Sequence, residues 1–185
     1  MKKHVCPWYI GYLLANPLRR LYQNPEKILS PYLKSGMKIL EVGPGMGFFS
    51  IPMARLVGET GRIYCVDLQE KMLKSLQCRA SKKHLLDRIE ICLCSESSLQ
   101  IENLTNVIDF ALAFAVVHEV PDQKKLFSEI ILSLRKDGLL LISEPNGHVA
   151  KEEFEKTLLI AQSNGMKVLD SPNINGNRSS VLKKV

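Results

Sequence analysis

The sequence lacks any hydrophobic run that approaches the roughly 18 residues needed to cross a bilayer. It has only five cysteines, and their odd number and irregular spacing do not form a disulfide framework. Repeats and low-complexity segments are absent, and 45% hydrophobic with 24% charged residues is typical of a globular domain. These absences exclude membrane-spanning helices, disulfide scaffolds and disordered chains. We expect one folded domain with an appendage and reduced thiols, located in the cytoplasm.

Acidic side chains are scarce at the start of the chain. Residues 1–40 hold seven basic residues and one acid, Glu26, which accounts for the whole net charge of +6. The same residues contain the single tryptophan, Trp8, and four of the five tyrosines. No signal-peptide cleavage site follows the first seventeen residues, so we expect them to belong to the mature protein. A basic, aromatic segment therefore precedes a remainder of balanced charge.

From residue 36 onward, short apolar runs alternate with amphipathic stretches. This alternation is typical of βαβ units. It predicts strands over residues 38–42, 62–67, 88–94, 107–117, 139–143, 166–169 and 180–184. It also predicts helices over residues 48–56, 69–82, 122–134 and 152–164, preceded by short helical pieces over 7–15, 17–23 and 25–29.

The expected fold class is α/β. We predict a doubly wound, Rossmann-like, seven-stranded and mostly parallel sheet with helices on both faces. Residues 1–35 would form an N-terminal helical lid or cap, and residues 36–185 would form the main domain. Ligands of such sheets bind beyond the carboxyl ends of the strands, beside the first strand.

A glycine-rich loop occupies that place in the sequence. It reads Glu41-Val-Gly43-Pro-Gly45-Met-Gly47, directly after the first predicted strand. A dinucleotide fingerprint, G-x-G-x-x-G/A, would need a small residue where this chain has Phe48. The spacing therefore disfavours a nicotinamide dinucleotide as the ligand.

Four segments resemble, in order and spacing, the motifs of class I S-adenosylmethionine-dependent methyltransferases. They are SGMKILEVGPGMGFFSIPMA, VDLQEKML, IDFALAFAVVHEVPD and LRKDGLLLISEP. Within that family the chain is most similar to small-molecule enzymes of the ubiquinone/menaquinone-biosynthesis and arsenite-methyltransferase type. The resemblance implies S-adenosyl-L-methionine as the cofactor and a small molecule as the methyl acceptor.

The resemblance also implies which residues bind the cofactor. Asp67 would accept both ribose hydroxyls, although a helix N-cap is an alternative role for it. Leu68 would pack on the adenine, and the Ala113 carbonyl would accept from the cofactor's amino group. The amino-acid end would be held by the loop residues Glu41, Gly43, Gly45 and Gly47.

The chain departs from the family after its third predicted strand. The family usually has an aspartate there that binds the adenine amino group, whereas this chain reads Cys94-Ser95-Glu96. Ser95 or Glu96 would have to replace that aspartate. We expect no metal site, because the cysteines of the strands suit a packed core. Cys6, outside the sheet, is a candidate for the substrate pocket.

Methyl transfer requires mainly that the acceptor be positioned and water excluded. His118 and Glu119 follow the fourth predicted strand, where the acceptor should lie. His118 is the candidate general base if the acceptor carries a proton, and the alternative is that it only lines the pocket.

The N-terminal segment is the candidate substrate lid. Trp8, Tyr9 and Tyr12 can cover an apolar acceptor. Arg19 and Arg20 can pair with an anionic group or with an acidic membrane surface. The alternative is a cap that only buries the sheet.

Two other functions stay open: a cofactor-binding subunit without catalysis, and an RNA methyltransferase. Nucleic acid is disfavoured because residues 41–185 carry no net charge and contain no Asn/Asp-Pro-Pro-Tyr/Phe motif.

Overall fold

A seven-stranded sheet runs through the protein, which we describe from a computed structural model covering residues 7–185. The strand order is β3-β2-β1-β4-β5-β7-β6. The strands are β1 (Lys38–Val42), β2 (Arg62–Asp67), β3 (Ile89–Leu93), β4 (Ile108–Phe114), β5 (Leu134–Pro145), β6 (Met166–Asp170) and β7 (Asn177–Lys184). The first five run parallel, and β7 runs antiparallel to both of its neighbours. The predicted fold class is confirmed.

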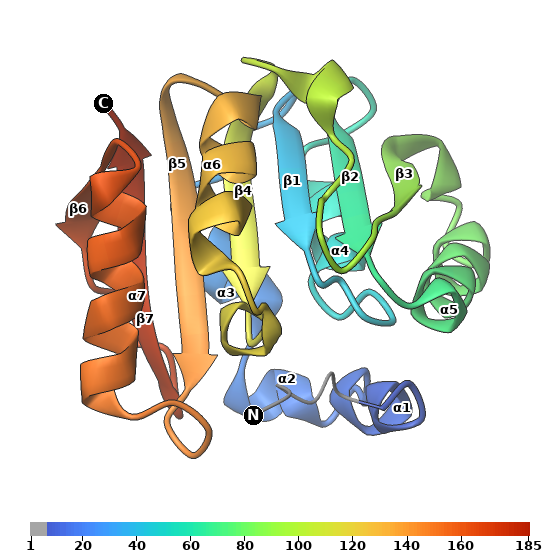
Figure 1. The fold of residues 1–185 in the computed structure, drawn as a ribbon. Helices are drawn as coiled ribbons and strands as arrows, with labels where there is room; N and C mark the ends of the chain where they lie inside the picture. The colour runs from blue at the N-terminus through green and yellow to red at the C-terminus, as the bar shows by residue number, and fades with distance from the viewer. Residues whose placement is uncertain (1–6) are drawn as a thin grey trace.

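The chain order reverses at β1, which pairs with β2 on one side and with β4 on the other. Such a reversal opens a crevice at the carboxyl ends of the strands, because the connections on its two sides leave toward opposite faces of the sheet. Figure 1 shows the arrowheads of β1, β2, β4 and β5 at this lower edge.

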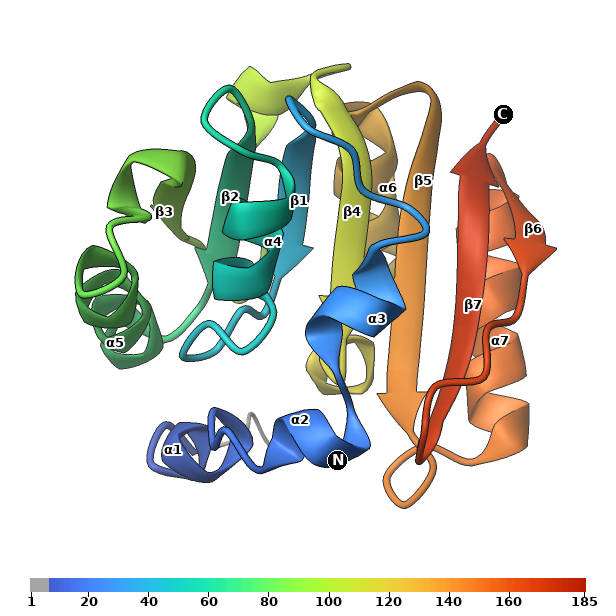
Figure 2. The ribbon, with the colours of Figure 1, turned by 180° about the vertical axis from the view of Figure 1, so that it is seen from behind.

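Helices cover both faces of the sheet. On one face lie α3 (Pro25–Leu29), α4 (Ser50–Leu56) and α5 (Glu70–Ser81), and on the other lie α6 (Gln123–Ser133) and α7 (Lys151–Ser163). Comparing Figure 1 with Figure 2 shows the two layers from opposite sides. Short 3₁₀ turns are η1 (Leu86–Arg88), η2 (Glu102–Leu104) and η3 (Val117–Glu119).

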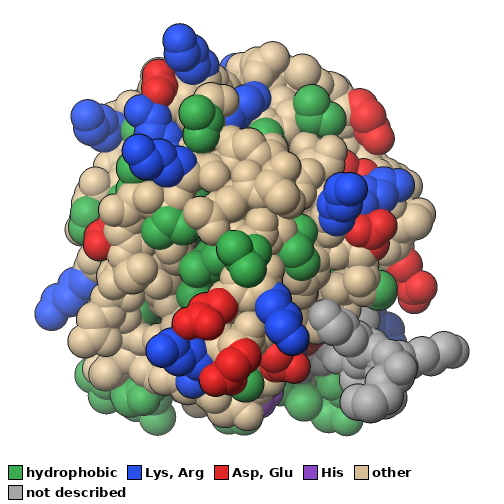
Figure 3. Space-filling model, turned by 60° about the vertical axis from the view of Figure 1, so that its left-hand side comes forward, with side chains coloured by type: hydrophobic (Ala, Val, Ile, Leu, Met, Phe, Trp, Pro, Cys, Tyr) green, Lys and Arg blue, Asp and Glu red, His purple; other side chains and the backbone are tan. Residues whose placement is uncertain are grey.

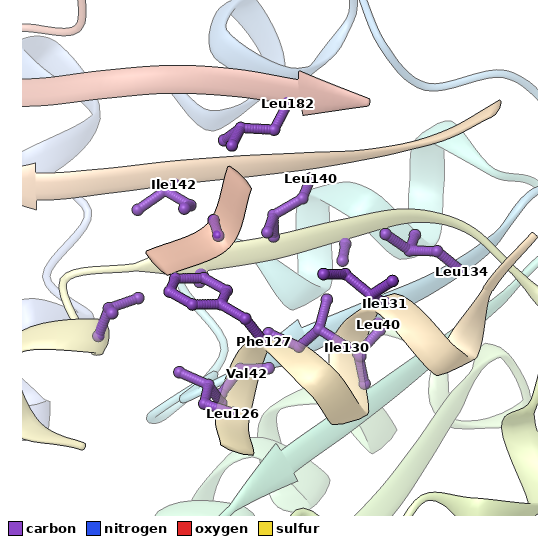
Figure 4. Packing of buried hydrophobic residues seen from close by; sticks show 14 of the residues in the cluster. Leu40, Val42, Leu126, Phe127, Ile130, Ile131, Leu134, Leu140, Ile142 and Leu182 are labelled. Atoms are coloured by element: carbon purple, nitrogen blue, oxygen red, sulfur yellow. The ribbon is translucent and has the colours of Figure 1, made fainter. Parts of the chain in front are cut away.

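The core between the sheet and α6 follows from helical spacing. Leu126, Phe127 and Ile130 fall on one face of α6 and are fully or almost fully buried. They pack against alternate residues of β1, β4 and β5, which include Leu40 and Ile142 (Figure 4). Since the parallel strands are covered on both faces, their residues are apolar in nearly every position.

The fourth strand is shorter than the apolar run 107–117 predicted. β4 ends at Phe114 because Ala115 adopts a left-handed conformation, with φ of 56°. The chain then turns into η3, which contains His118. Hydrophobicity alone does not mark this turn, and the turn changes where His118 points.

The N-terminal segment divides into two parts. α1 (Ile10–Leu14) and α2 (Arg19–Tyr22) lie across the carboxyl edge of the strands in both views (Figures 1 and 2). α3 instead packs beside α4, and its Leu29 is fully buried. Asn24 caps α3 by accepting from Lys27 N at 3.2 Å, as its place before Pro25 predicts. The part of residues 1–35 that can act as a lid is therefore α1 with α2.

The surface over α7 and the β6 edge carries both signs of charge (Figure 3). Lysines and acids pair there, as Lys151 and Glu155 do at 3.8 Å. This face is not a continuous basic surface of the kind that binds nucleic acid. Among residues 7–185, no helix is long and apolar enough to span a bilayer.

Candidate functional site

A cavity of about 420 Å³ lies at the carboxyl ends of β1, β2 and β4, within the size range of small-molecule sites. Its walls are the glycine loop after β1, the ends of β2 and β4, the loop after β3, and the first turns of α6. Gly11 of α1 and the side chain of Arg19 in α2 also line it. The cavity thus occupies the crevice at the topological switch point.

The glycine loop brings backbone directly to this cavity. Gly43, Gly45 and Gly47 have φ of 68°, 55° and 85°, in the left-handed region that favours glycine. A Cβ built on Gly45 would meet no atom within 4 Å, so the loop is open at this point. Gly47 instead faces Leu76 of α5 and does not line the cavity. The loop leaves room for a ligand to contact the main chain.

Asp67 ends β2 and is 9% exposed, on the wall of the cavity. Its Oδ1 accepts from Gln69 N at 2.8 Å and its Oδ2 from Gly45 N at 3.2 Å. Burial raises the pKa of Asp67, and these backbone hydrogen bonds oppose the rise. α5 has Gln69 as its N-cap, so Asp67 is not the capping residue. Both carboxylate oxygens are held in place and each keeps lone-pair capacity for a ligand hydroxyl.

Glu41 lies deeper in the same wall and is 3% exposed. Its Oε2 accepts from Ser50 Oγ at 2.5 Å and from Cys65 Sγ at 3.7 Å. Burial raises the pKa of Glu41 to about 7, with these two bonds opposing the rise and the nearby Asp67 adding to it. A cationic group bound here would favour the ionised form.

One end of the cavity is aromatic and cationic. Phe48, Phe49 and Phe114 line it, and the centroids of the Phe49 and Phe114 rings are 4.3 Å apart. The Arg19 guanidinium lies 4.3 Å from the centroid of Phe48, a cation–π distance. Burial lowers the pKa of Arg19, but a guanidinium stays protonated in proteins. This end combines an apolar surface with one positive charge.

The lid packs on the glycine loop through small residues. A Cβ on Gly11 would lie 2.7 Å from Met72 Sδ and 3.0 Å from Met46 Cε, so α1 lies directly against these two methionine side chains. Ala15, Met46 and Met72 form a separate buried cluster at this contact. Arg79 of α5 donates to Met46 O at 2.8 Å and to the lid at Ala15 O. α1 therefore packs directly over the glycine loop and α5.

The structure places His118 away from the cavity. After the turn at Ala115, His118 lines a neighbouring hollow between α6 and α7, together with His148. Its Nδ1 hydrogen-bonds the buried carboxylate of Glu144, which also accepts from Val117 N at 2.7 Å. Glu119 does line the cavity. The expectation that His118 projects into the cavity at the end of β4 is therefore wrong, because the side chain lines the neighbouring hollow.

Several other predicted residues also lie elsewhere. Ala113 sits in the ladder between β1 and β5, and Phe114 and Ala115 line the cavity in its place. Arg20 pairs with Glu26 at 3.6 Å instead of reaching the cavity. The aromatic residues Trp8, Tyr9 and Tyr12 are 38%, 60% and 64% exposed and do not line it. Cys6 lies outside the described residues.

The predicted residues that the structure brings together around the cavity are Arg19, Glu41, Gly43, Gly45, Asp67, Leu68, Ser95, Glu96 and Glu119. Sequence reasoning missed Phe49, Phe114 and Glu129, which also line it. Only the aromatic pair at 48–49, inside the glycine motif, offered a local signal for any of these. Across residues 7–185 no cluster of three or more metal-ligating side chains is present.

The model of a family described as methyltransferase domain matches residues 33–178. The mitochondrial ubiquinone biosynthesis O-methyltransferase of Homo sapiens is 32% identical over 112 residues, covering 60% of this chain and 29% of that protein. Ribosomal protein L11 methyltransferase of Dictyoglomus turgidum is 25% identical over 144 residues, covering 78% of this chain and 43% of that protein. The chain thus spans less than half the length of these curated relatives.

A solved structure shares the whole fold. It is described as a SAM-dependent methyltransferase from Aquifex aeolicus, with a TM-score of 0.88 and 24% identity. The match covers 98% of this chain and 100% of that one, so the lid and the last two strands have counterparts in the same architecture.

Proposed function

The chain belongs to the family of class I S-adenosylmethionine-dependent methyltransferases, and from this premise we propose that it methylates a small, partly hydrophobic acceptor that carries an anionic group. The observation that supports this acceptor class is the guanidinium of Arg19, 4.3 Å from the Phe48 ring centroid at the closed end of the cavity. An apolar surface with one fixed cation suits a small organic anion.

The residues of the cavity fit S-adenosylmethionine, which supplies an electrophilic methyl group when bound. Gly45 leaves the loop open for close approach, and Asp67 offers two oriented oxygens to the ribose hydroxyls. Glu41 offers a buried carboxyl to the cationic amino-acid end. Leu68 supplies an apolar wall. Each group is held before a ligand arrives, which reduces the ordering that binding requires.

Catalysis rests mainly on positioning. Phe48, Phe49 and Phe114 would hold the apolar part of the acceptor while the lid excludes water. Glu119 lines the cavity after β4 and would accept a proton from the methyl acceptor. His118 is not assigned this role, because the bond to Glu144 holds its ring beside the neighbouring hollow.

The test is a methylation assay with methyl-labelled S-adenosylmethionine and a panel of small carboxylates, phenols and amines, with total RNA and ribosomal protein as separate arms. Once an acceptor is found, Arg19→Met should lower kcat/KM by roughly 10- to 100-fold, the loss of one charge-assisted hydrogen bond. Arg20→Met is the matched control, because Arg20 is on the same helix as Arg19 but pairs with Glu26 of α3. Equal losses in both variants would contradict the acceptor class.

A macromolecular acceptor is the competing function. A relative named as a methyltransferase of ribosomal protein L11 and the basic N-terminal segment favour it. Labelling of RNA or ribosomal protein, with none in the small-molecule panel, would replace the proposal by this one. A cofactor-binding subunit without catalysis would bind S-adenosylhomocysteine and label none of the three arms.

A further inference from the structure

The cavity wall formed by the loop after β3 has Ser95 at the position where the resemblance to the family implies an adenine-binding aspartate. The cavity is lined there by Cys94–Leu99 and by Lys125, Leu126 and Glu129 of α6. Leu68, Leu99 and Leu126 add apolar side chains to the lining of the cavity, which suit the faces of a purine. The polar side chains on this wall that can accept a hydrogen bond from an amino group include Ser95, Glu96 and Glu129.

Ser95 is committed to its own turn. Its backbone N–H donates to Ser98 O at 3.0 Å, and its hydroxyl lies 3.4 Å from the same carbonyl oxygen. The Ser95 and Ser97 hydroxyls are 3.2 Å apart. Glu96 is exposed, so water competes for its carboxylate. Neither Ser95 nor Glu96 offers a buried oxygen, fixed in place, that could accept a hydrogen bond from adenine.

Glu129 differs from both in being anchored. Its Oε2 accepts from Leu99 N at 2.6 Å, so α6 and the loop after β3 meet at this carboxylate. The side chain is half-buried, and within residues 7–185 no lysine or arginine lies within ion-pair distance of it. Burial raises the pKa of the Cys94 thiol, and the nearby carboxylates of Asp67 and Glu129 add to the rise, so both carboxylates lie in the neighbourhood of this thiol. The Glu129 carboxylate, held by Leu99 N, thus lines the same cavity as Asp67.

We propose that Glu129 is the residue that selects adenine, by accepting a hydrogen bond from the 6-amino group of the cofactor. In this chain the carboxylate that accepts the hydrogen bond from adenine comes from α6 and not from the loop after β3. The inference rests on the cofactor assignment of the proposed function. It adds the reason why Ser95 can stand where the family has an aspartate: the carboxylate is supplied from another element.

The experiment compares two ligands that differ at this one position. S-adenosylhomocysteine presents an amino donor, whereas S-inosylhomocysteine presents a carbonyl acceptor that a carboxylate repels. By calorimetry the unaltered protein should bind the adenosyl ligand roughly 10- to 100-fold more tightly. Glu129→Gln keeps the size and the Leu99 contact but adds an amide donor, so it should reduce that ratio at least about tenfold.

Glu96→Gln is the matched control and should leave the ratio unchanged. If Glu96→Gln changes the ratio and Glu129→Gln does not, the proposal is overturned in favour of the loop residue. Equal affinity of the unaltered protein for the two ligands overturns it without any variant, even if Glu129→Gln fails to fold. Failure to bind S-adenosylhomocysteine at all would instead contradict the proposed function.

Discussion

Gln23, at the end of α2, donates from Nε2 to Asn177 Oδ1 of β7 at 2.8 Å, although 154 positions separate them. The same nitrogen donates to Asn175 O, and Gln23 Oε1 accepts from Arg19 Nε at 3.0 Å. Asn177 in turn donates to Ser143 Oγ at 2.9 Å. A partly buried series of polar contacts therefore ties Arg19 to the end of the sheet, with its guanidinium on the cavity lining.

Gln23→Leu should loosen the lid at this point. It leaves the partly buried groups of Asn177 and Arg19 without Gln23 as a partner, which costs roughly 1 kcal/mol of unfolding free energy. Denaturant unfolding measures the loss. Gln100→Leu, on an exposed loop, serves as the control. A stability equal to that of the unaltered protein would show that the chain of bonds is not formed in solution.

Asp67→Ala should weaken binding of S-adenosylhomocysteine by roughly 30- to 1000-fold, equivalent to 2–4 kcal/mol. The variant removes both oriented oxygens and releases Gly45 N and Gln69 N. Calorimetry gives the affinity, and circular dichroism checks that the fold remains. Undiminished binding would show that the ribose hydroxyls contact another residue.

Glu41 should make the stability of the ligand-free protein depend on pH. Its folded-state pKa of about 7 lies above the usual 4.5, so the folded protein holds this proton more tightly than the unfolded chain. The resulting stabilisation is complete below about pH 4.5 and is lost as the pH rises through about 7, a change of about 3 kcal/mol.

Glu41→Gln removes this titration and keeps the shape of the side chain. The difference in unfolding free energy between the unaltered protein and this variant, measured between pH 5 and 8, should fall steadily as the pH rises. Parallel pH profiles for the two proteins would mean that Glu41 is not buried as described.

Deletion of residues 1–24 should abolish methyl transfer while S-adenosylhomocysteine still binds within about tenfold. Gly11→Val tests the same segment with one change, since its Cβ would lie 2.7 Å from Met72 Sδ and the methionine side chains under α1 would have to shift to make room for it. Normal turnover by a folded truncation would contradict the lid. A truncation that cannot fold would favour a structural cap.

The outer face of the lid is the part of the molecule that we predict to touch an anionic membrane surface. Gly11, Ala15 and Arg19 face inward, and opposite them Leu13 and Leu21 are 71% and 87% exposed. Apolar helix faces beside basic residues bind anionic lipid. The protein should co-sediment with phosphatidylglycerol vesicles, and Leu13→Ser with Leu21→Ser should reduce this.

Neutral phosphatidylcholine vesicles are the lipid control, and Leu132→Ser with Leu159→Ser, exposed on α6 and α7, is the matched variant. Loss of binding in both double variants alike would mean that the lid is not the contact surface. Co-sedimentation that does not depend on anionic lipid would contradict the electrostatic part of the prediction.

Local sequence determined most of the scaffold. The spacing of the apolar residues predicted most strands and helices to within a few residues. Each strand or helix buries one face, and the side chains on that face recur with a period set by residues close together in the chain. The glycine loop was predicted for the same reason, since a strand, a tight turn and the next helix form one continuous stretch. The role of Asp67 was implied by the resemblance of VDLQEKML to a motif of the family. Asn24 before Pro25 is a further local signal, and α3 begins there.

The tertiary structure alone decided which side chains share the cavity. The left-handed turn at Ala115 sends His118 toward Glu144, and nothing in the apolar run before it marks that turn. Glu129 meets the loop after β3 only because α6 packs on the sheet beside it. Arg19 and Arg20 are adjacent in sequence, yet one lines the cavity and the other pairs with Glu26. Such placements depend on contacts between residues far apart in the chain, and the local period of a sequence carries no information about them.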